Sequence, residues 1–248
     1  MLDKILANKK YEIEKIPEIL PKRTKDILEP LQTLKNKPFI AEVKKASPSI
    51  GEIKPDASPA SQAEQYEKYG AGAVSVLTDK HFFKGSFEYL KEVSEKVNIP
   101  VLCKDFIISE RQIEAAYAFG ADIILIIAAI LTQEEIEKLS EKAREMNLHI
   151  LYEIHTPEEY EKIKNLSPAM VGVNSRNLDT LEIDKQKGAQ ILNALPDTFF
   201  KIAESGINST EDIVNFRKAG ADAFLIGTYL MKSGNIRESF QNLYRGLE

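Results

Sequence analysis

Eight short apolar segments alternate with segments of helical periodicity along most of this chain. An amphipathic segment, with apolar residues three and four positions apart, follows each apolar segment. Strands that alternate with helices in this way pair in parallel, because each helix returns the chain to the same end of the sheet. The pattern predicts an α/β protein with eight strands. They are expected to begin near Phe39, Ala73, Val101, Asp122, His149, Met170, Phe200 and Ala223.

A weak internal repeat indicates how the strands are arranged. The stretches YGAGAVSVL, FGADIILII and AGADAFLIG each end a helix in glycine and enter a strand through the same small-residue step. Glycine readily adopts the left-handed conformation that ends a helix, and the recurrence indicates that one unit was reused. No linker rich in Pro, Gly or Ser separates the units. A closed (β/α)8 TIM barrel is therefore expected, and an open doubly wound sheet is the alternative.

The first 38 residues precede the first strand. They contain Pro17, Pro21, Pro30 and Pro38 among stretches of helical character. We expect an N-terminal helical extension that caps the barrel, with a flexible arm as the alternative. Residues 1–248 are thus expected to form one domain, with the extension over 1–38 and the barrel over 39–248, because α/β barrels of this length remain a single unit.

Composition excludes several classes of function. The net charge is -5 and no run of Lys or Arg is present, which argues against a nucleic-acid partner. Cys103 is the only cysteine, which excludes an internal disulfide and fits a reducing compartment, and the three histidines lack metalloenzyme spacing. The longest apolar stretch, residues 123–131, is too short to cross a bilayer. We expect a cytoplasmic protein without a metal or a membrane partner.

Charged side chains close four of the apolar segments, where a buried strand would normally carry Val, Ile or Leu. An unpaired ionised group in an apolar interior costs several kcal/mol, so each of these residues needs a partner or a function. In a barrel the carboxyl ends of all strands meet at one mouth. One shared site is therefore expected, and a structural salt bridge is the alternative for any single residue. The polar residues expected there are Glu42, Lys44, Lys104, Glu153, Asn174, Arg176 and Glu204.

Two kinds of chemistry fit lysines that are mixed with carboxylates in a desolvated pocket. Neighbouring charges can shift pKa values toward neutrality, as general acid and base catalysis requires. A lysine with a depressed pKa could instead form a Schiff base with a carbonyl substrate. The spacing of the residues leaves both open.

Two small-residue turns, AESGINS and FLIGTYLM, follow the seventh and eighth strands and lead into helices. Backbone N–H groups at such turns can approach an anion closely, and barrels often bind phosphate at this place. Simple turns without a ligand are the alternative. A phosphate site is expected, with a hydroxyl added by the Ser47-Pro48-Ser49 loop. Its residues would be Ser47, Ser205, Gly206, Gly227 and Thr228.

Aromatic residues lie just past the second and third strands. Phe83 and Phe106 could form an apolar wall of the pocket there, and anchoring of the loops is the alternative. Arg176 has a planar guanidinium that could stack on an aromatic substrate or pair with a carboxylate.

Eight stretches carry a resemblance to a known family. They are IAEVKKASPSIG, SVLTDKHFFKGS, LCKDFI, GADIILIIAAIL, YEIHT, VGVNSRNLDTLEID, AESGI and FLIGTYLM. In these stretches the chain resembles the indole-3-glycerol phosphate synthase family of tryptophan biosynthesis. The Ser-Pro-Ser loop and NSRNL distinguish that family from other phosphate-binding barrels. The N-terminal extension resembles the family only in being helical and variable, so it receives no residue roles.

The resemblance implies a carboxy-lyase reaction. It would cyclise 1-(2-carboxyphenylamino)-1-deoxyribulose 5-phosphate to indole-3-glycerol phosphate, with loss of CO2 and water and without a cofactor. Lys104 would protonate the ribulose carbonyl during ring closure, and Glu153 would transfer a proton during dehydration. Glu42 would stabilise developing positive charge, and Lys44 would hold the substrate carboxylate or donate a proton. The resemblance leaves open which of Glu42, Glu153 and Lys44 handles the second proton transfer.

The resemblance also implies how the substrate is held. Asn174 and Glu204 would position its amine and hydroxyls, and the phosphate would lie at the five residues named above. Two positions depart from the family pattern: Ala129 stands where some relatives carry arginine, and Thr228 replaces serine or glutamate. The anthranilate pocket would be lined by Arg176, Phe83, Phe106 and Leu125.

Two other functions remain as alternatives. One is a Schiff-base aldolase on a sugar phosphate that uses Lys104 or Lys44, and the other is a catalytically silent barrel that acts as a binding subunit. In each case the expected partner is a small phosphorylated molecule. The acidic exterior fits a monomer or a homodimer, and the family reading implies contact with other enzymes of tryptophan synthesis.

Overall fold

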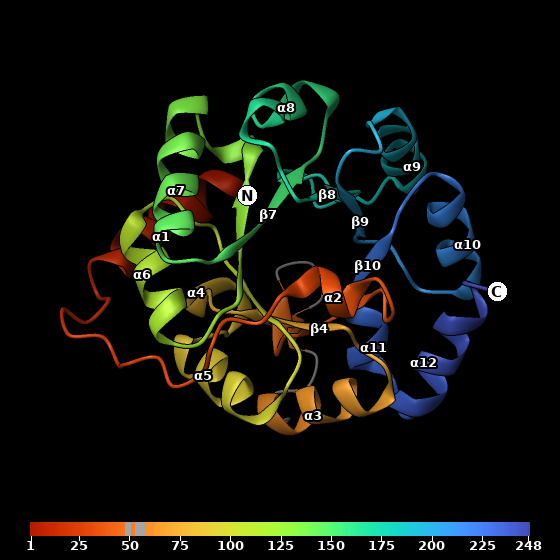
Figure 1. The fold of residues 1–248 in the computed structure, drawn as a ribbon, viewed down its shortest axis with the longest axis horizontal. Helices are drawn as coiled ribbons and strands as arrows, with labels where there is room; N and C mark the ends of the chain where they lie inside the picture. Colours follow the sequence, from red (N-terminus) through yellow and green to blue (C-terminus); the bar gives the residue numbers. More distant parts are fainter. Residues whose placement is uncertain (48–50, 53–57) are drawn as a thin grey trace.

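Eight parallel strands close into a barrel in which β1 pairs with both β4 and β10 (Figure 1). The computed structural model describes residues 1–47, 51–52 and 58–248, with the side chains of residues 47 and 52 left out. Closure through β1 and β10 confirms the (β/α)8 barrel and rules out the open sheet. The strands are β1 (Phe39–Val43), β4 (Ala73–Leu77), β5 (Val101–Lys104), β6 (Ile123–Ile127), β7 (His149–Ile154), β8 (Met170–Asn174), β9 (Phe200–Glu204) and β10 (Ala223–Ile226).

Helices surround the barrel as an outer ring (Figure 1). The longer ones are α3 (Pro59–Tyr69), α5 (Phe87–Lys96), α6 (Glu110–Ala118), α7 (Gln133–Glu145), α9 (Lys185–Ala194), α10 (Thr210–Lys218) and α12 (Ile236–Arg245). Short helical segments lie between them: α4 (Lys80–Phe83), η1 (Ala128–Ile130), α8 (Pro157–Glu161), η2 (Lys164–Leu166) and α11 (Thr228–Lys232). An antiparallel pair of two-residue strands, β2 (Ala46–Ser47) and β3 (Gly51–Glu52), follows β1.

Local sequence signals set where the helices begin and end. The hydroxyl of Thr132 accepts a hydrogen bond from the backbone N–H of Glu135, whose carboxylate accepts one from the N–H of Thr132 in return. The three repeated glycines all have φ between 96° and 121°, a region that side chains rarely adopt. They end α3, α6 and α10, as the repeat predicts. These glycines are Gly70, Gly120 and Gly220.

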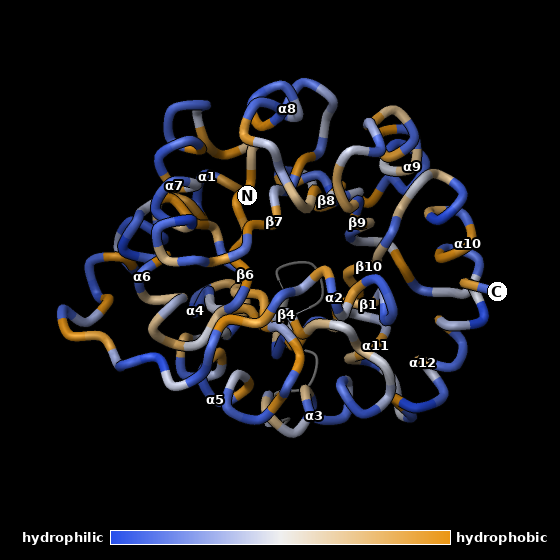
Figure 2. The backbone as a smooth tube through the Cα atoms, in the orientation of Figure 1, coloured by the Kyte–Doolittle hydropathy of each residue, from blue (hydrophilic) through white to orange (hydrophobic). Residues whose placement is uncertain are grey.

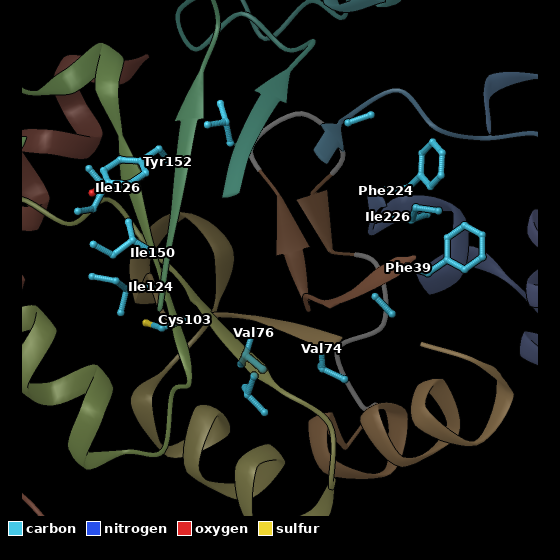
Figure 3. Packing of buried hydrophobic residues seen from close by; sticks show 14 of the residues in the cluster. Phe39, Val74, Val76, Cys103, Ile124, Ile126, Ile150, Tyr152, Phe224 and Ile226 are labelled. Atoms are coloured by element: carbon cyan, nitrogen blue, oxygen red, sulfur yellow. The ribbon is translucent and has the colours of Figure 1, made fainter. Parts of the chain in front are cut away.

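Two apolar clusters hold the barrel together. The outer one packs the strands against the helices, with Phe39, Val74 and Cys103 among its members (Figure 3). Burial raises the pKa of the Cys103 thiol to about 12, so this cysteine is an inert part of the core. The second cluster fills the barrel and includes Leu102 and Ile202. Figure 2 shows apolar residues concentrated on the strands, while the outer turns of the helices are hydrophilic.

The N-terminal extension runs from one end of the barrel to the other. Its first helix, α1 (Leu2–Ile13), packs Ile5 against the barrel interior. The connecting segment is held by Arg111 of α6, which donates to the carbonyls of Pro17 and Glu18. Helix α2 (Pro30–Leu34) then lies across the end of the barrel where the strands begin (Figure 1). The expected helical extension is therefore present and packs on the barrel.

Asp122 joins the extension to two strands at that end. Its Oδ1 lies 2.6 Å from Arg23 Nη2 and accepts the backbone N–H of Leu28 at 3.1 Å, while Oδ2 accepts the N–H of Val101 at 2.9 Å. The sequence predicts Asp122 as the start of a strand, but the strand begins one residue later. The carboxylate is thus a junction between the extension, β5 and β6.

In the described part of the chain, no helix is long and apolar enough to cross a bilayer.

We expect Asp122→Ala to lower the free energy of unfolding by about 2–4 kcal/mol, because it leaves two backbone N–H groups without their acceptor and removes the carboxylate that pairs with Arg23. Urea denaturation followed by far-UV circular dichroism measures the change. Lys91→Ala serves as the control, since the Lys91–Glu95 pair is half exposed at 3.9 Å and such pairs contribute about 0.5 kcal/mol or less. Equal stability of the two variants would contradict the junction role.

Candidate active site

The carboxyl ends of β5, β7 and β9 bring a lysine between two carboxylates. Lys104 Nζ lies 3.0 Å from Glu153 Oε2 and 3.1 Å from Glu204 Oε2. Both glutamates are 1% exposed, so the three charges share one desolvated space. The sequence predicts a shared site for these residues, and the barrel brings them together within hydrogen-bond distance.

Gly172 on β8 makes room for this group. A Cβ atom at that position would lie 2.1 Å from Glu204 Oε1, closer than any two such atoms approach. Glu204 Oε1 is itself buried, and no protein atom in the described part of the chain hydrogen-bonds to it. A glycine inside a strand often marks such a close approach. The glycine inside the VGVN stretch was therefore a sequence signal for this close approach, although it was not among the predicted site residues.

Glu42 and Lys44 form a second ion pair at the end of β1. Glu42 Oε1 lies 2.7 Å from Lys44 Nζ, and the carboxylate is buried. Burial opposes ionisation of Glu42, but Lys44 and then Lys104 hold its pKa below the usual value. A Cβ at Gly227 would lie 2.3 Å from Glu42 Oε1. Gly227, expected at the phosphate turn, thus also lets the backbone pass close to this pair.

Neighbouring charges fix the protonation of the Lys104 group. Burial disfavours the charged lysine, but the surrounding carboxylates, Glu153 foremost, outweigh it and raise the pKa of Lys104. Burial alone would raise the pKa of Glu153 as well, yet Lys104 and His155 hold it below the usual range. Burial and the negative charge of Glu153 raise the pKa of Glu204 in spite of Lys104. Of these three residues, only Glu204 has a pKa shifted toward neutrality, whereas the sequence predicted such a shift for all three.

Aromatic and aliphatic side chains form one wall of the site. The rings of Phe83 and Phe106 lie 6.3 Å apart between centroids and are tilted by 35°. With Leu125 they line a cavity of about 310 Å³ on the side of β5 and β6. Ile5 of α1 adds to this wall, although no residue of the extension was predicted to belong to the site.

The two small-residue turns line the opposite side of the same cavity, after β9 and β10. Ser205 and Gly206 have φ of 66° and 79°, and Ser205 is one of few non-glycine residues in that region. Thr228 begins α11 directly after Gly227. The hydroxyl of Ser47, with Pro48 and Ser49, falls outside the described part of the structure, so its contact with a phosphate stays a prediction.

Asn174 and Arg176 close the cavity on the side of β8. Asn174 Oδ1 accepts the backbone N–H of Arg176 at 3.0 Å, which fixes the turn after the strand. The guanidinium of Arg176 donates to the carbonyl of Leu181 at 2.9 Å. Both residues line the cavity, as expected.

Within the described ranges, no group of three His, Cys, Asp or Glu side chains could hold a metal ion.

His155 contacts the active-site carboxylate Glu153 and was not among the predicted residues. Its Nε2 lies 3.3 Å from Glu153 Oε1, on the side of the carboxylate away from Lys104, and its Nδ1 lies 3.3 Å from Glu159 Oε2. Burial opposes protonation of the ring, but the two glutamates outweigh it and raise the pKa of His155 to about 9. Its place two residues after Glu153 was the available signal.

A closed parallel barrel with charged residues and small-residue turns at the carboxyl ends of its strands defines the class of (β/α)8-barrel enzymes. Within that class, the chain belongs to the indole-3-glycerol phosphate synthase family. The family model of that name matches residues 2–243. The indole-3-glycerol phosphate synthase of Bacillus cereus is 44% identical over an alignment of 248 positions, which covers 98% of this chain and 97% of that protein. The one from Aliarcobacter butzleri is 42% identical over 241 residues, 95% and 92% of the two chains.

Solved structures with low sequence identity share the fold. Thiamine phosphate pyrophosphorylase from Pyrococcus furiosus superposes with a TM-score of 0.62 at 16% identity, over 86% of this chain and 97% of that one. The 3-hexulose-6-phosphate synthase from Salmonella typhimurium gives a TM-score of 0.65 at 12% identity, over 84% and 97%. At these identities the likeness shows the barrel alone.

The stability conferred by His155 should depend on pH. Because its pKa is raised from 6.5 to about 9, its contribution is complete below pH 6.5 and is lost as pH rises through 9. We expect His155→Gln to lower the free energy of unfolding at pH 6 by up to about 3 kcal/mol more than it does at pH 10. Urea unfolding at the two pH values measures the difference.

His149→Gln is the matched control for that series, since His149 pairs with Glu29 at 3.5 Å with both side chains partly exposed. Solvent screens such a pair, so the effect of His149→Gln on the free energy of unfolding should differ by no more than about 0.5 kcal/mol between the two pH values. A pH-independent effect of His155→Gln would show that its ion pair with Glu153 contributes nothing.

Proposed function

We propose that this chain cyclises 1-(2-carboxyphenylamino)-1-deoxyribulose 5-phosphate to indole-3-glycerol phosphate, with release of CO2 and water. One observation carries the proposal: in a chain of this family, Lys104 is held charged by Glu153 and Glu204 inside a cavity with an apolar wall and two small-residue turns on opposite sides. The roles given below to single residues belong to this proposal.

The two ends of the substrate suit the two sides of the cavity. Its aromatic ring would lie against Phe83, Phe106 and Leu125, and its phosphate would lie at the turns of Ser205-Gly206 and Gly227-Thr228. Lys44 and Arg176 provide positive charge for the ring carboxylate, and Asn174 is available to the amine and hydroxyls. This placement would hold the reacting ketose carbonyl near Lys104, between the two ends.

Ring closure needs an acid at the carbonyl oxygen. As the ring carbon attacks the carbonyl carbon, Lys104 Nζ would give its proton to the oxygen, which becomes a hydroxyl. The electron pair of the bond to the departing CO2 then restores the aromatic ring. Because the surrounding carboxylates raise its pKa, Lys104 starts the reaction in the protonated form that this step requires.

Dehydration then needs an acid and a base. The new hydroxyl would leave as water with a proton from the site, for which Lys44 is one candidate, and Glu153 would take the proton that the neighbouring carbon loses as the indole forms. Its lowered pKa keeps Glu153 ionised and able to accept it. Glu42, also ionised, would stabilise positive charge on the nitrogen. The second proton transfer is assigned to Glu42, Glu153 and Lys44 together, without a choice among them.

The same electrostatics disfavour the Schiff-base alternative. A lysine that attacks a carbonyl must be neutral, whereas the carboxylates around Lys104 hold it in the charged form. The silent-barrel alternative has no support either, since the expected catalytic groups Glu42, Lys44, Lys104 and Glu153 all line the cavity.

We infer that residues 1–38 and 39–248 work as one domain, which the contacts of the extension with α6 and Asp122 support. We further infer a cytoplasmic monomer or homodimer that receives its phosphorylated substrate from, and passes its product to, other enzymes of tryptophan synthesis. The single buried cysteine fits a reducing compartment.

We expect Lys104→Ala to lower kcat at least a hundredfold, because a positioned general acid contributes roughly 10² to 10⁴ in rate. The growth of indole fluorescence after addition of the substrate measures the rate, against a low background, since the chain contains no tryptophan. Far-UV circular dichroism checks that the variant folds. Lys91→Ala is the control, and near-normal turnover by Lys104→Ala would contradict the mechanism.

Borohydride treatment separates the two chemistries. Wild-type protein incubated with substrate and sodium borohydride should show no mass increase, because neither Lys104 nor Lys44 is proposed to form an imine. Intact-mass spectrometry provides the measurement. A borohydride-dependent adduct on either lysine would instead establish the aldolase reading.

A further inference from the structure

A lysine of the N-terminal extension is buried beside the active site. Lys9 on α1 is 1% exposed, which is rare for this residue type. Its Nζ lies 2.7 Å from Asp105 Oδ1, 2.8 Å from Asp79 Oδ2 and 2.6 Å from Glu12 Oε2. The two aspartates belong to the barrel, so Lys9 is an ionic link between the extension and the active-site end.

Each of these aspartates fixes a segment that carries an aromatic residue of the cavity wall. Asp79 is the N-cap of α4, and its Oδ1 accepts the backbone N–H of Phe82 at 2.7 Å. Helix α4 ends at Phe83. Asp105 Oδ1 accepts the backbone N–H of Phe106 at 2.7 Å. The two carboxylates that bind Lys9 therefore anchor the backbone segments from which the rings of Phe83 and Phe106 project.

Without a cation, these two carboxylates would oppose each other. Asp79 and Asp105 are 0% and 5% exposed, and Lys9 contacts both. Thr78 donates to Asp105 Oδ2 at 2.7 Å, but it brings no charge. Two buried carboxylates that lose their shared cation repel each other or take up protons, and either change would loosen their hold on the backbone.

Helix α1 places a second side chain at the same wall. Ile5 lies one turn before Lys9 on the same helix face and lines the cavity with Phe83 and Phe106. One face of α1 thus supplies an apolar contact inside the cavity and a cation behind its aromatic wall.

We propose that Lys9 is a positioning residue for the aromatic pocket: by neutralising Asp79 and Asp105 it holds Phe83 and Phe106 at the separation that accepts a planar ring. Lys9 does not line the cavity and touches no reacting atom. The extension is thereby part of the apparatus that recognises the substrate. The chemical class of the ligand, an aromatic carboxylate, rests on the proposed function.

Binding of the separate ends of the substrate tests this role without turnover. In Lys9→Met, the Kd for anthranilate, followed by the fluorescence of anthranilate itself, should rise at least tenfold. The Kd for inorganic phosphate, measured calorimetrically, should stay within a factor of two. An unchanged anthranilate Kd, or an equal loss of phosphate binding, would overturn the proposal.

A control variant separates positioning from general loosening of the extension. Arg111→Ala removes the contacts with Pro17 and Glu18 and leaves both aspartates paired. It should bind anthranilate with a Kd within a factor of two of wild type. A tenfold loss in Arg111→Ala would show that docking of the extension, rather than the charge of Lys9, sets the pocket.

A double variant covers the case in which Lys9→Met does not fold. In Lys9→Met/Asp79→Asn, one carboxylate is removed with the cation, and the asparagine can still cap α4 while its amide donates to Asp105. Its anthranilate Kd should lie within threefold of wild type. A folded double variant with a tenfold higher Kd would contradict the neutralising role.

In turnover, a Lys9 variant should show a raised KM with kcat within about threefold of wild type, since uniform binding is lost. Failure of the wild-type protein to form the indole product would defeat the proposed function, whereas an anthranilate Kd that Lys9→Met leaves unchanged would defeat only the role of Lys9.

Discussion

A lysine held between two buried carboxylates is the interaction on which the mouth of this barrel depends. Neither Lys104 nor Glu153 could remain ionised there alone, because desolvation would neutralise it. Lys104 therefore needs β7 and β9 to present Glu153 and Glu204 at its own level, which ties barrel closure and strand register to the chemistry. Gly172 follows from the same requirement, since β8 lies between those two strands and any side chain there would displace Glu204.

Periodicity predicted the barrel because each strand is an apolar run between amphipathic helices, and that pattern is local. Seven of the eight strands begin at the predicted residue and one begins a single residue later, at Ile123. The β2–β3 pair and the short helices α4 and α11 were not predicted. Segments of two to five residues are too short to show a helical or strand period in the sequence. Their structure depends on turn chemistry instead.

The site was predictable where a residue breaks a local pattern, as Lys104 and Glu153 do at strand ends. Lys9 breaks no pattern: it precedes a second lysine in an amphipathic helix, where lysine normally faces water. Its partners Asp79 and Asp105 are distant in sequence, and only the fold brings them to it. The pKa shifts are equally non-local, because each is a balance between burial and charges from several strands. Hence the sequence indicated which groups meet but not which one holds a proton.

The extension pairs with the middle of the chain, and this has a consequence for synthesis on the ribosome. Lys9 binds Asp79 and Asp105, and Arg23 binds Asp122, so the first residues to emerge find their partners only after between a third and a half of the chain has been made. Strand β1 waits still longer for β10. Long-range pairings of this kind slow folding. The amino terminus is thus made first but stays unsecured until the middle of the chain has been made.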